Sequence, residues 1–315
     1  MLENLLFSLN ATVPMFCIMV LGYLLRRYTP LMPESFADAM NTFVFKVALP
    51  VQLFENLSTS DFHTIWDGGV VVFCFLVSLA SILILLALSY FLRDRSLQAE
   101  FIQASYRGSQ ALLGAALMQN IYGSTGPLAL VLIGAVPLYN VAAVVLLTLM
   151  TPGGHLDRRT AAKTVRGIVT NPIILGIAAG LVWSLLRLPQ PVMLQRGVES
   201  LAATATPLGL LALGASIDLG RAVGCWRPTL MATAFKLVLF AAAFLPLAVV
   251  LGYREEVLVV VLIMLASPTT VSCFSMARSM GHDGTLSSGA VMLTTLLSAF
   301  TFTFWLYLLR SLGLI

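Results

Sequence analysis

The sequence is short of charged residues. Only 10% of its 315 residues are Asp, Glu, Lys or Arg, against about 25% in a typical soluble domain. Hydrophobic residues make up 59% of the chain, and its mean hydropathy is +0.94. The net charge of +4 comes from loop arginines rather than from a basic tail, which argues against a nucleic-acid partner. This composition predicts an all-α polytopic membrane protein.

Residues for metal binding and covalent chemistry are also scarce. The four cysteines form no CxxC pair, and the three histidines show no ligand spacing, so we expect no disulfide framework, no metal and no cofactor. The chain has no Gly-rich phosphate loop, nucleophile elbow or cluster of candidate nucleophiles, which argues against an enzyme. Its first residues contain Glu3 and no basic region, so a cleaved signal peptide is not expected.

Long apolar runs fill most of the chain. A membrane-spanning helix needs about 20 apolar residues, and with this length we count about ten spans. The predicted spans are 5–25, 34–57, 65–92, 99–122, 127–150, 168–186, 198–219, 228–251, a ninth that begins near 258 and contains 266–281, and 285–309.

Basic residues fall mostly in the loops after the odd-numbered spans. Eleven lie there, and four lie in loops on the other side or at the C-terminal end of the last span. The eleven are Arg26, Arg27, Arg93, Arg95, Arg158, Arg159, Lys163, Arg166, Arg221, Arg227 and Arg278, and the four are Arg187, Arg196, Arg254 and Arg310. Because Lys and Arg concentrate on the cytoplasmic side, the bias predicts a cytoplasmic loop over 151–166 and both termini outside the cell (inner) membrane.

The chain contains an internal repeat. Landmarks recur at an offset of 157 or 158 residues: Pro14 with Pro172, Gly22 with Gly180, Pro50 with Pro207, and Tyr122-Gly123 with Met280-Gly281. Each copy holds five spans, so the second copy must be inverted relative to the first. The predicted organisation is a first repeat over 1–150 and an inverted second repeat over 167–315, an arrangement that recurs in secondary transporters.

The ninth span is interrupted by polar residues and a proline. Pro268 removes a backbone donor inside an apolar run, and Thr269, Thr270 and Ser272 follow it. A broken helix at membrane depth is tolerated only where protein or a water-filled cavity encloses it, and it often marks a transporter's binding site. A simple proline kink is the alternative, with the hydroxyls bonded back to the helix.

The repeat places a counterpart in the fourth span. There, Gly108 and Gly114 flank Ser109 and Gln110. Glycines permit irregular backbone geometry, so we predict a second broken helix that crosses the first. A glycine-packed helix interface is the alternative. The predicted substrate-binding residues are Ser109, Gln110, Gly114, Pro268, Thr269, Thr270 and Ser272.

Four ionisable residues are candidates for charge or proton coupling. Lys46 and Lys236 lie deepest in the predicted spans, and Asp38 and Arg107 lie nearer span ends. Charges inside a membrane usually face a cavity or a partner, although snorkelling or a helix-end role would also explain them. Asn140, three residues after Pro137, is expected to bond to the backbone that this proline frees.

Taken together, these motifs resemble the auxin efflux carrier family, which includes bacterial malonate and malate permease-like proteins and is related to the plant PIN-FORMED carriers. The resemblance covers essentially the whole chain. It rests on Val13-Pro14 with Gly22-Tyr23, Ala48-Leu49-Pro50, Arg107-Gly108-Ser109-Gln110 with Gly114 and Tyr122-Gly123, Pro207-Leu208-Gly209 through Leu213-Gly214-Ala215-Ser216, and Ala266-Ser267-Pro268.

The resemblance implies broken helices that cross near the membrane centre, a domain that moves against a scaffold, and a homodimer. The family pattern has asparagine where this chain has Ser109 and proline where it has Ala116. Without the proline, Gly114 is the predicted weak point of the fourth span. Without the asparagine amide, the resemblance does not determine the identity of the substrate.

We therefore hypothesise a secondary transporter, an efflux carrier or permease, for a small organic anion such as a mono- or dicarboxylate. Helix N-termini at the breaks would hold the carboxylate, and membrane lipid would surround the protein. Two alternatives stay open. A sodium-coupled organic anion symporter of the bile-acid type would need carboxylate and amide ligands for sodium near the crossing, and a non-transporting membrane sensor would need a domain to signal through.

Overall fold

The structure is a computed structural model. It describes residues 2–59, 67–92, 94–123, 127–150, 166–167, 169–216 and 225–315. Within these ranges every regular element is a helix, and β pairing is limited to one isolated bridge. Apart from residue 166, the predicted connecting loop 151–166 lies outside the described residues.

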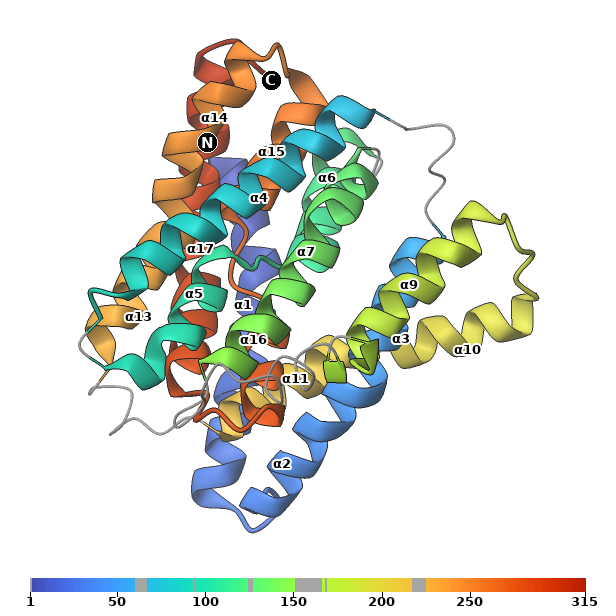
Figure 1. Cartoon of the computed structure of the whole chain (residues 1–315), viewed down its shortest axis with the longest axis vertical. Helices are drawn as coiled ribbons and strands as arrows, with labels where there is room; N and C mark the ends of the chain where they lie inside the picture. The colour runs from blue at the N-terminus through green and yellow to red at the C-terminus, as the bar shows by residue number, and fades with distance from the viewer. Residues whose placement is uncertain are drawn as a thin grey trace.

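Figure 1 shows the helices in their order along the chain. In the first half they are α1 (Leu2–Tyr28), α2 (Glu34–Phe43), the π-helical turn η1 (Val44–Ala48), α3 (Leu49–Ser58), α4 (Gly68–Ser89), the 3-10 turn η2 (Arg95–Leu97), α5 (Gln98–Tyr106), the π-helical turn η3 (Gln110–Gly114), α6 (Ala115–Tyr122) and α7 (Leu128–Leu149). In the second half they are α9 (Pro172–Leu185), α10 (Val192–Ala203), α11 (Ala205–Ala215), α13 (Trp226–Ala234), the π-helical turn η4 (Phe235–Leu239), α14 (Phe240–Val250), α15 (Glu255–Ala266), α16 (Val271–Ser279) and α17 (Thr285–Ser311).

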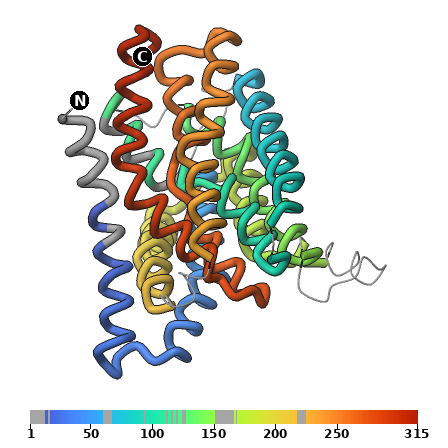
Figure 2. Tube along the Cα trace, turned by 90° about the vertical axis from the view of Figure 1, so that its left-hand side faces the viewer, coloured from blue at the N-terminus to red at the C-terminus, as the bar shows by residue number. Residues whose placement is uncertain are grey.

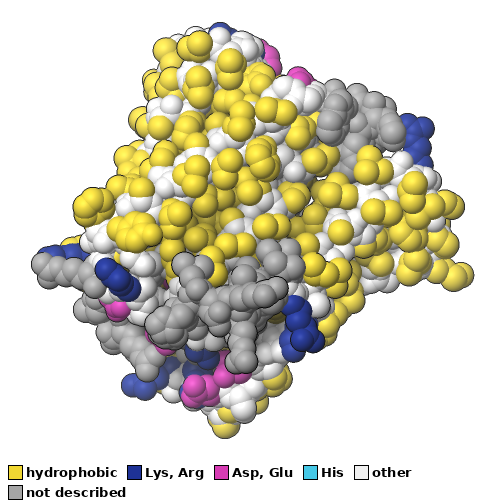
Figure 3. All heavy atoms as spheres, in the orientation of Figure 1, with side chains coloured by type: hydrophobic (Ala, Val, Ile, Leu, Met, Phe, Trp, Pro, Cys, Tyr) yellow, Lys and Arg dark blue, Asp and Glu magenta, His cyan; other side chains and the backbone are white. Residues whose placement is uncertain are grey.

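Five helical segments among the described residues are long and apolar enough to cross a membrane. They are Gly68–Ser89, Leu128–Leu149, Val192–Ala215, Trp226–Val250 and Thr285–Ser311. Hydrophobic side chains cover most of the face shown in Figure 3, and charged side chains gather mainly toward its lower end. The predicted class, an all-α membrane protein, is confirmed.

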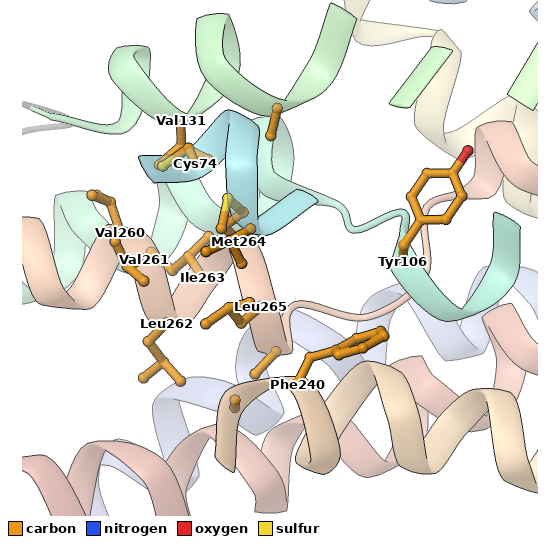
Figure 4. Close-up of a cluster of buried hydrophobic side chains, with 14 of the residues drawn as sticks. Cys74, Tyr106, Val131, Phe240, Val260, Val261, Leu262, Ile263, Met264 and Leu265 are labelled. Atoms are coloured by element: carbon orange, nitrogen blue, oxygen red, sulfur yellow. The ribbon is translucent and has the colours of Figure 1, made fainter. Parts of the chain in front are cut away.

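The core of the molecule surrounds α15. All residues from 258 to 266 are at most 5% exposed, so this helix is apolar and buried on every side. Figure 4 shows its side chains from Val260 to Leu265 within one cluster, together with Cys74 of α4, Val131 of α7 and Phe240 of α14. The helix that leads to Pro268 is therefore held rigidly by its neighbours.

The helices pack as two groups. In what we call the lateral group, α3 packs against α9 and α10, and α11 packs against α1 and α2. In the crossing group, α4 packs against α5 and α7, α14 against α15, and α17 against α13 and α16. Contacts of α1 with α17 and of α11 with α16 join the groups. Helix α1 begins and α17 ends at the same end of the molecule (Figure 1), and Figure 2 shows α17, in red, beside the blue part of α1.

Two glycine contacts in the lateral group match the sequence repeat. A Cβ on Gly22 of α1 would overlap the carbonyl oxygen of Leu211 in α11, and one on Gly180 of α9 would lie 2.9 Å from the carbonyl oxygen of Phe54 in α3. The glycines are 158 residues apart, and their partners are 157 apart. The same close helix approach therefore occurs at corresponding positions of the two halves.

Two helices of the crossing group are interrupted. Helix α15 ends at Ala266, and Ser267 is extended with φ −64° and ψ 148°, as expected for a residue before proline. The break at Pro268 that the sequence predicts is confirmed, and α16 resumes the chain at Val271. The other interruption separates α5, which ends at Tyr106, from η3, which begins at Gln110.

The two interruptions pair with each other. Gly108 and Thr269 form an antiparallel bridge, and the Ser109 amide donates to the Pro268 carbonyl at 2.9 Å. Each break thus provides hydrogen-bond partners for backbone groups of the other. Buried backbone N–H and C=O groups need such partners.

The position of the first break corrects the prediction that Gly114 is its weak point. The backbone is extended at Arg107, whereas Gly114 ends the helical turn η3 and leads directly into α6. Gly108 is the residue that permits the pairing, because a Cβ there would overlap Ser267 Oγ and lie 2.9 Å from Lys236 Nζ.

Candidate functional site

A cavity lies where the paired breaks of the crossing group face the lateral group. Its volume is about 70 Å³, which is room for about five to seven water molecules at 10–15 Å³ each. It is lined by Leu49, Gln52 and Leu53 of α3, Ala205, Thr206 and Leu210 of α11, residues 107–110 and 268–272 of the breaks and their helices, Val136, Tyr139 and Asn140 of α7, and Thr295 of α17. None of these described lining residues is Asp or Glu.

Arg107 supplies the positive charge at this cavity. Its side chain is 3% exposed, and the extended backbone at the break directs it between α7 and α16. Its Nη2 donates to Asn140 Oδ1 and to Ser272 Oγ, each at 2.9 Å, and Nη1 lies 3.1 Å from Met276 Sδ and 3.5 Å from Gln103 Oε1. All four partners are neutral, and among the described residues no carboxylate forms an ion pair with Arg107.

The amino end of α16 adds to this positive field. Its N-cap residue, Thr270, makes no capping hydrogen bond through its side chain to a described residue, so free backbone N–H groups remain at that end. A helix N-terminus carries a partial positive charge that favours anions. Because a guanidinium also lies beside it, the cavity is suited to bind an anion.

Most of the predicted substrate-binding residues surround the cavity. Ser109, Gln110, Pro268, Thr270 and Ser272 all line it. The Gln110 side chain is buried beside the Tyr139 hydroxyl, and its amide nitrogen has no well-oriented hydrogen-bond acceptor among the described residues. This nitrogen is therefore a donor that a bound ligand could use.

Thr269 and Gly114 differ from the others. Thr269 lines the cavity, but its hydroxyl donates to the Ala104 carbonyl at 2.8 Å and its amide donates to Thr294 Oγ1 at 2.9 Å. Its side chain therefore holds the crossing together. Gly114 does not line the cavity, and a Cβ there would meet Ile263 at 2.7 Å, so it is a packing contact.

The structure separates the four ionisable candidates. Arg107 lines the cavity, and Lys236 lies 1% exposed behind the paired breaks. Lys46 is exposed on η1 and is not among the lining residues. Asp38 of α2 forms an ion pair with Arg278 of α16 at 2.8 Å, which links the two helix groups at a distance from the cavity.

Several lining residues were missed by the sequence analysis. Gln52 and Thr206 come from the lateral group, and the Gln52 amide nitrogen lies 3.5 Å from the Thr206 hydroxyl. Their positions beside Pro50 and Pro207 are the signal that could have identified them. Asn140 was expected to bond to the backbone that Pro137 frees; its amide nitrogen donates to the Val136 carbonyl instead, and its oxygen accepts from Arg107.

Long apolar helices, with two interrupted helices paired beside a cavity, are features of the membrane transporter class. The sequence profile of the family described as membrane transport protein matches residues 7–306. The chain therefore belongs to this family, the auxin efflux carrier family that the motifs indicate. It is 26% identical over 307 residues, 95% of both chains, to a protein of Rhizobium meliloti (strain 1021) that is described provisionally as a malonate transporter.

Proposed function

We propose that this protein is a secondary transporter that carries a small carboxylate across the cell membrane by alternating access. The observation that carries the proposal is Arg107, a buried guanidinium at the cavity whose partners are all neutral. A buried charge without a counter-charge is strongly unfavourable, so an anionic substrate would complete the site. The small cavity favours a short organic acid, and the provisional name of the Rhizobium relative points to malonate.

The position of the cavity supports alternating access. Its walls come from both helix groups, so sliding of one group against the other would expose it first to one side of the membrane and then to the other. No feature of the sequence supplies ATP binding, so an ion gradient or the membrane potential would drive the movement. The absence of Asp and Glu from the described lining residues favours this proposal over a sodium symporter that uses carboxylate ligands.

We propose the wider architecture on the same basis. The protein would have ten membrane-spanning segments arranged as two inverted repeats. They would be α1, α2–α3, α4, α5–α6, α7, α9, α10–α11, α13–α14, α15–α16 and α17. The matched contacts of Gly22 and Gly180 support the repeat. Both termini would lie outside, as the basic loops predict, and the homodimer implied by the resemblance stays a prediction.

The test is uptake by purified protein in proteoliposomes. Malonate, malate, lactate and an indole carboxylate are offered separately, with and without a proton gradient. We expect saturable uptake of at least one acid and a loss of affinity of about tenfold or more in Arg107→Gln, because hydrogen bonds to a charged group are among the stronger ones. Arg310→Gln, at an exposed arginine near the end of α17, is the matched control. Folded protein that carries none of the four acids, or Arg107→Gln with wild-type affinity, would contradict the proposal.

A further inference from the structure

Lys236 lies directly behind the paired breaks. It belongs to η4 and is 1% exposed. Its Nζ donates to the carbonyl oxygens of Met264 at 2.9 Å, Leu265 at 3.1 Å and Tyr106 at 3.4 Å. Among the described residues, no carboxylate forms an ion pair with it.

Two of these carbonyls, those of Met264 and Leu265, lack their usual helical partners because of the break in α15. In an uninterrupted helix the Met264 carbonyl would accept from residue 268, but Pro268 has no N–H. The Leu265 carbonyl would accept from residue 269, but the Thr269 amide donates to Thr294. Lys236 therefore satisfies acceptors that the interruption of α15 exposes.

The carbonyls also belong to two helices whose ends meet. Tyr106 is the last residue of α5, and Met264 and Leu265 lie in the last turn of α15. Each C-terminal end carries a partial negative charge. An ammonium between two such ends is stabilised by both, and its three N–H groups match three acceptors.

Gly108 provides the space for this arrangement. A Cβ at this position would lie 2.9 Å from Lys236 Nζ and 3.1 Å from Cε. The glycine at the first break therefore allows the ammonium to approach both helix ends at once.

We propose that the Lys236 ammonium is a tethered cation that occupies the place where transporters with broken helices bind a coupling Na⁺. In such transporters, exposed backbone carbonyls and half-helix C-terminal ends coordinate the ion, and here they surround Nζ. Lys236 is a positioning residue, because it holds the crossing and does not line the cavity. Substrate binding and transport consequently need no Na⁺. The transport part of this inference rests on the proposed function.

The first measurement is the ion dependence of the wild-type protein. Uptake of the transported acid is compared in NaCl and in choline chloride at equal ionic strength, and thermal unfolding is recorded in the same two salts without substrate. We expect no difference in either experiment. A wild-type protein that needs Na⁺ for uptake, or that Na⁺ stabilises against heating, would overturn the inference.

Variants then test the charge itself. Lys236→Met removes the charge and keeps the length, so we expect a lower unfolding temperature and uptake slower by about tenfold or more, because several hydrogen bonds to a charged group are lost. Lys236→Ala leaves room for a small cation, and we expect NH₄Cl to raise its unfolding temperature relative to choline chloride. Lys46→Met, at an exposed lysine of the π-helical turn η1, should unfold like the wild type.

The outcomes separate this inference from the proposed function. If no acid is carried, the proposed function fails, yet the unfolding experiments still test the tethered cation. If Lys236→Met retains wild-type uptake and wild-type unfolding temperature, the tethered cation is wrong while carboxylate transport stands. If removal of the charge prevents folding, the wild-type salt comparison alone can still refute the inference.

Discussion

Arg107 Nη2 and Ser272 Oγ lie 2.9 Å apart, although 165 residues separate them in the chain. The bond joins the first break to the beginning of α16 and fixes the guanidinium against the amino end of that helix. Two positive features, a side chain and a helix terminus, are thus held together at one cavity. An anion placed between them would relieve their mutual repulsion, as the proposed carboxylate site requires.

Arg107→Lys should bind substrate with an affinity between those of the wild type and Arg107→Gln. Lysine keeps the charge but lacks the planar guanidinium, whose Nη2 donates to both Asn140 and Ser272 while Nη1 faces other partners. We expect the concentration for half-maximal uptake to rise by about threefold to tenfold, a loss of about 1 kcal/mol for one hydrogen bond. Uptake measured over a range of substrate concentrations in proteoliposomes checks this. An affinity as low as that of Arg107→Gln would show that geometry, and not charge, dominates binding.

Gly108→Ala should destabilise the crossing. The added Cβ would overlap Ser267 Oγ and approach Lys236 Nζ, and overpacking of this kind costs about 1–3 kcal/mol. We expect a lower unfolding temperature and a loss of uptake, measured on the same preparation. Gly197→Ala is the matched control: this glycine is exposed in α10 and a Cβ there meets nothing within 4 Å. Equal unfolding temperatures for the two variants would contradict the close packing at Gly108.

One break is easier to locate from the sequence than the other, for a physical reason. Pro268 interrupts a helix by its own chemistry, since it lacks an N–H and constrains its predecessor. Gly108 only permits an interruption, and the interruption forms because Thr269, far away in the chain, pairs with it. A glycine pattern alone could not distinguish Gly108 from Gly114, which packs against Ile263.

Lys46 and Lys236 show that the sequence does not predict which way a side chain points. Lys46 and Lys236 both lie in π-helical turns inside predicted spans, so composition and depth treat them alike. One is exposed and the other is enclosed by three carbonyls. These carbonyls belong to segments that are distant in the sequence, so the residues around Lys236 do not predict that its side chain is enclosed.

The ion pair of Asp38 with Arg278 should influence movement more than stability. It joins α2 of the lateral group to α16 of the crossing group, and the two side chains are 49% and 30% exposed. Exposed pairs contribute about 0–1 kcal/mol, so we expect Asp38→Asn and Arg278→Gln to change the uptake rate by up to about fivefold with little effect on unfolding.

The charge-reversed double variant provides the control for this pair. Asp38→Arg combined with Arg278→Asp restores an opposite-charge pair, so its uptake rate should return toward the wild-type value. A double-mutant cycle on uptake rates measures the coupling between the two positions. Strictly additive effects of the single variants would show that the contact does not restrain the helix groups.

Glu100→Gln should weaken the start of α17 without changing substrate affinity. The Glu100 side chain is 1% exposed, and its two oxygens accept from the Gly284 amide at 2.8 Å and from the Ser287 amide at 3.0 Å. A carboxylate at a helix N-terminus satisfies free N–H groups and complements the helix dipole. Glutamine replaces one acceptor with a donor and removes the charge, so we expect a destabilisation of about 1–3 kcal/mol, seen as a lower unfolding temperature. Because Glu100 does not line the cavity, half-saturation of uptake should stay at the wild-type value.

Glu34→Gln is the matched control, since that carboxylate is 76% exposed in its pair with Arg26 and its loss should matter little. A Glu100→Gln variant that unfolds like Glu34→Gln would mean that α17 does not depend on this carboxylate for its amino-terminal hydrogen bonds.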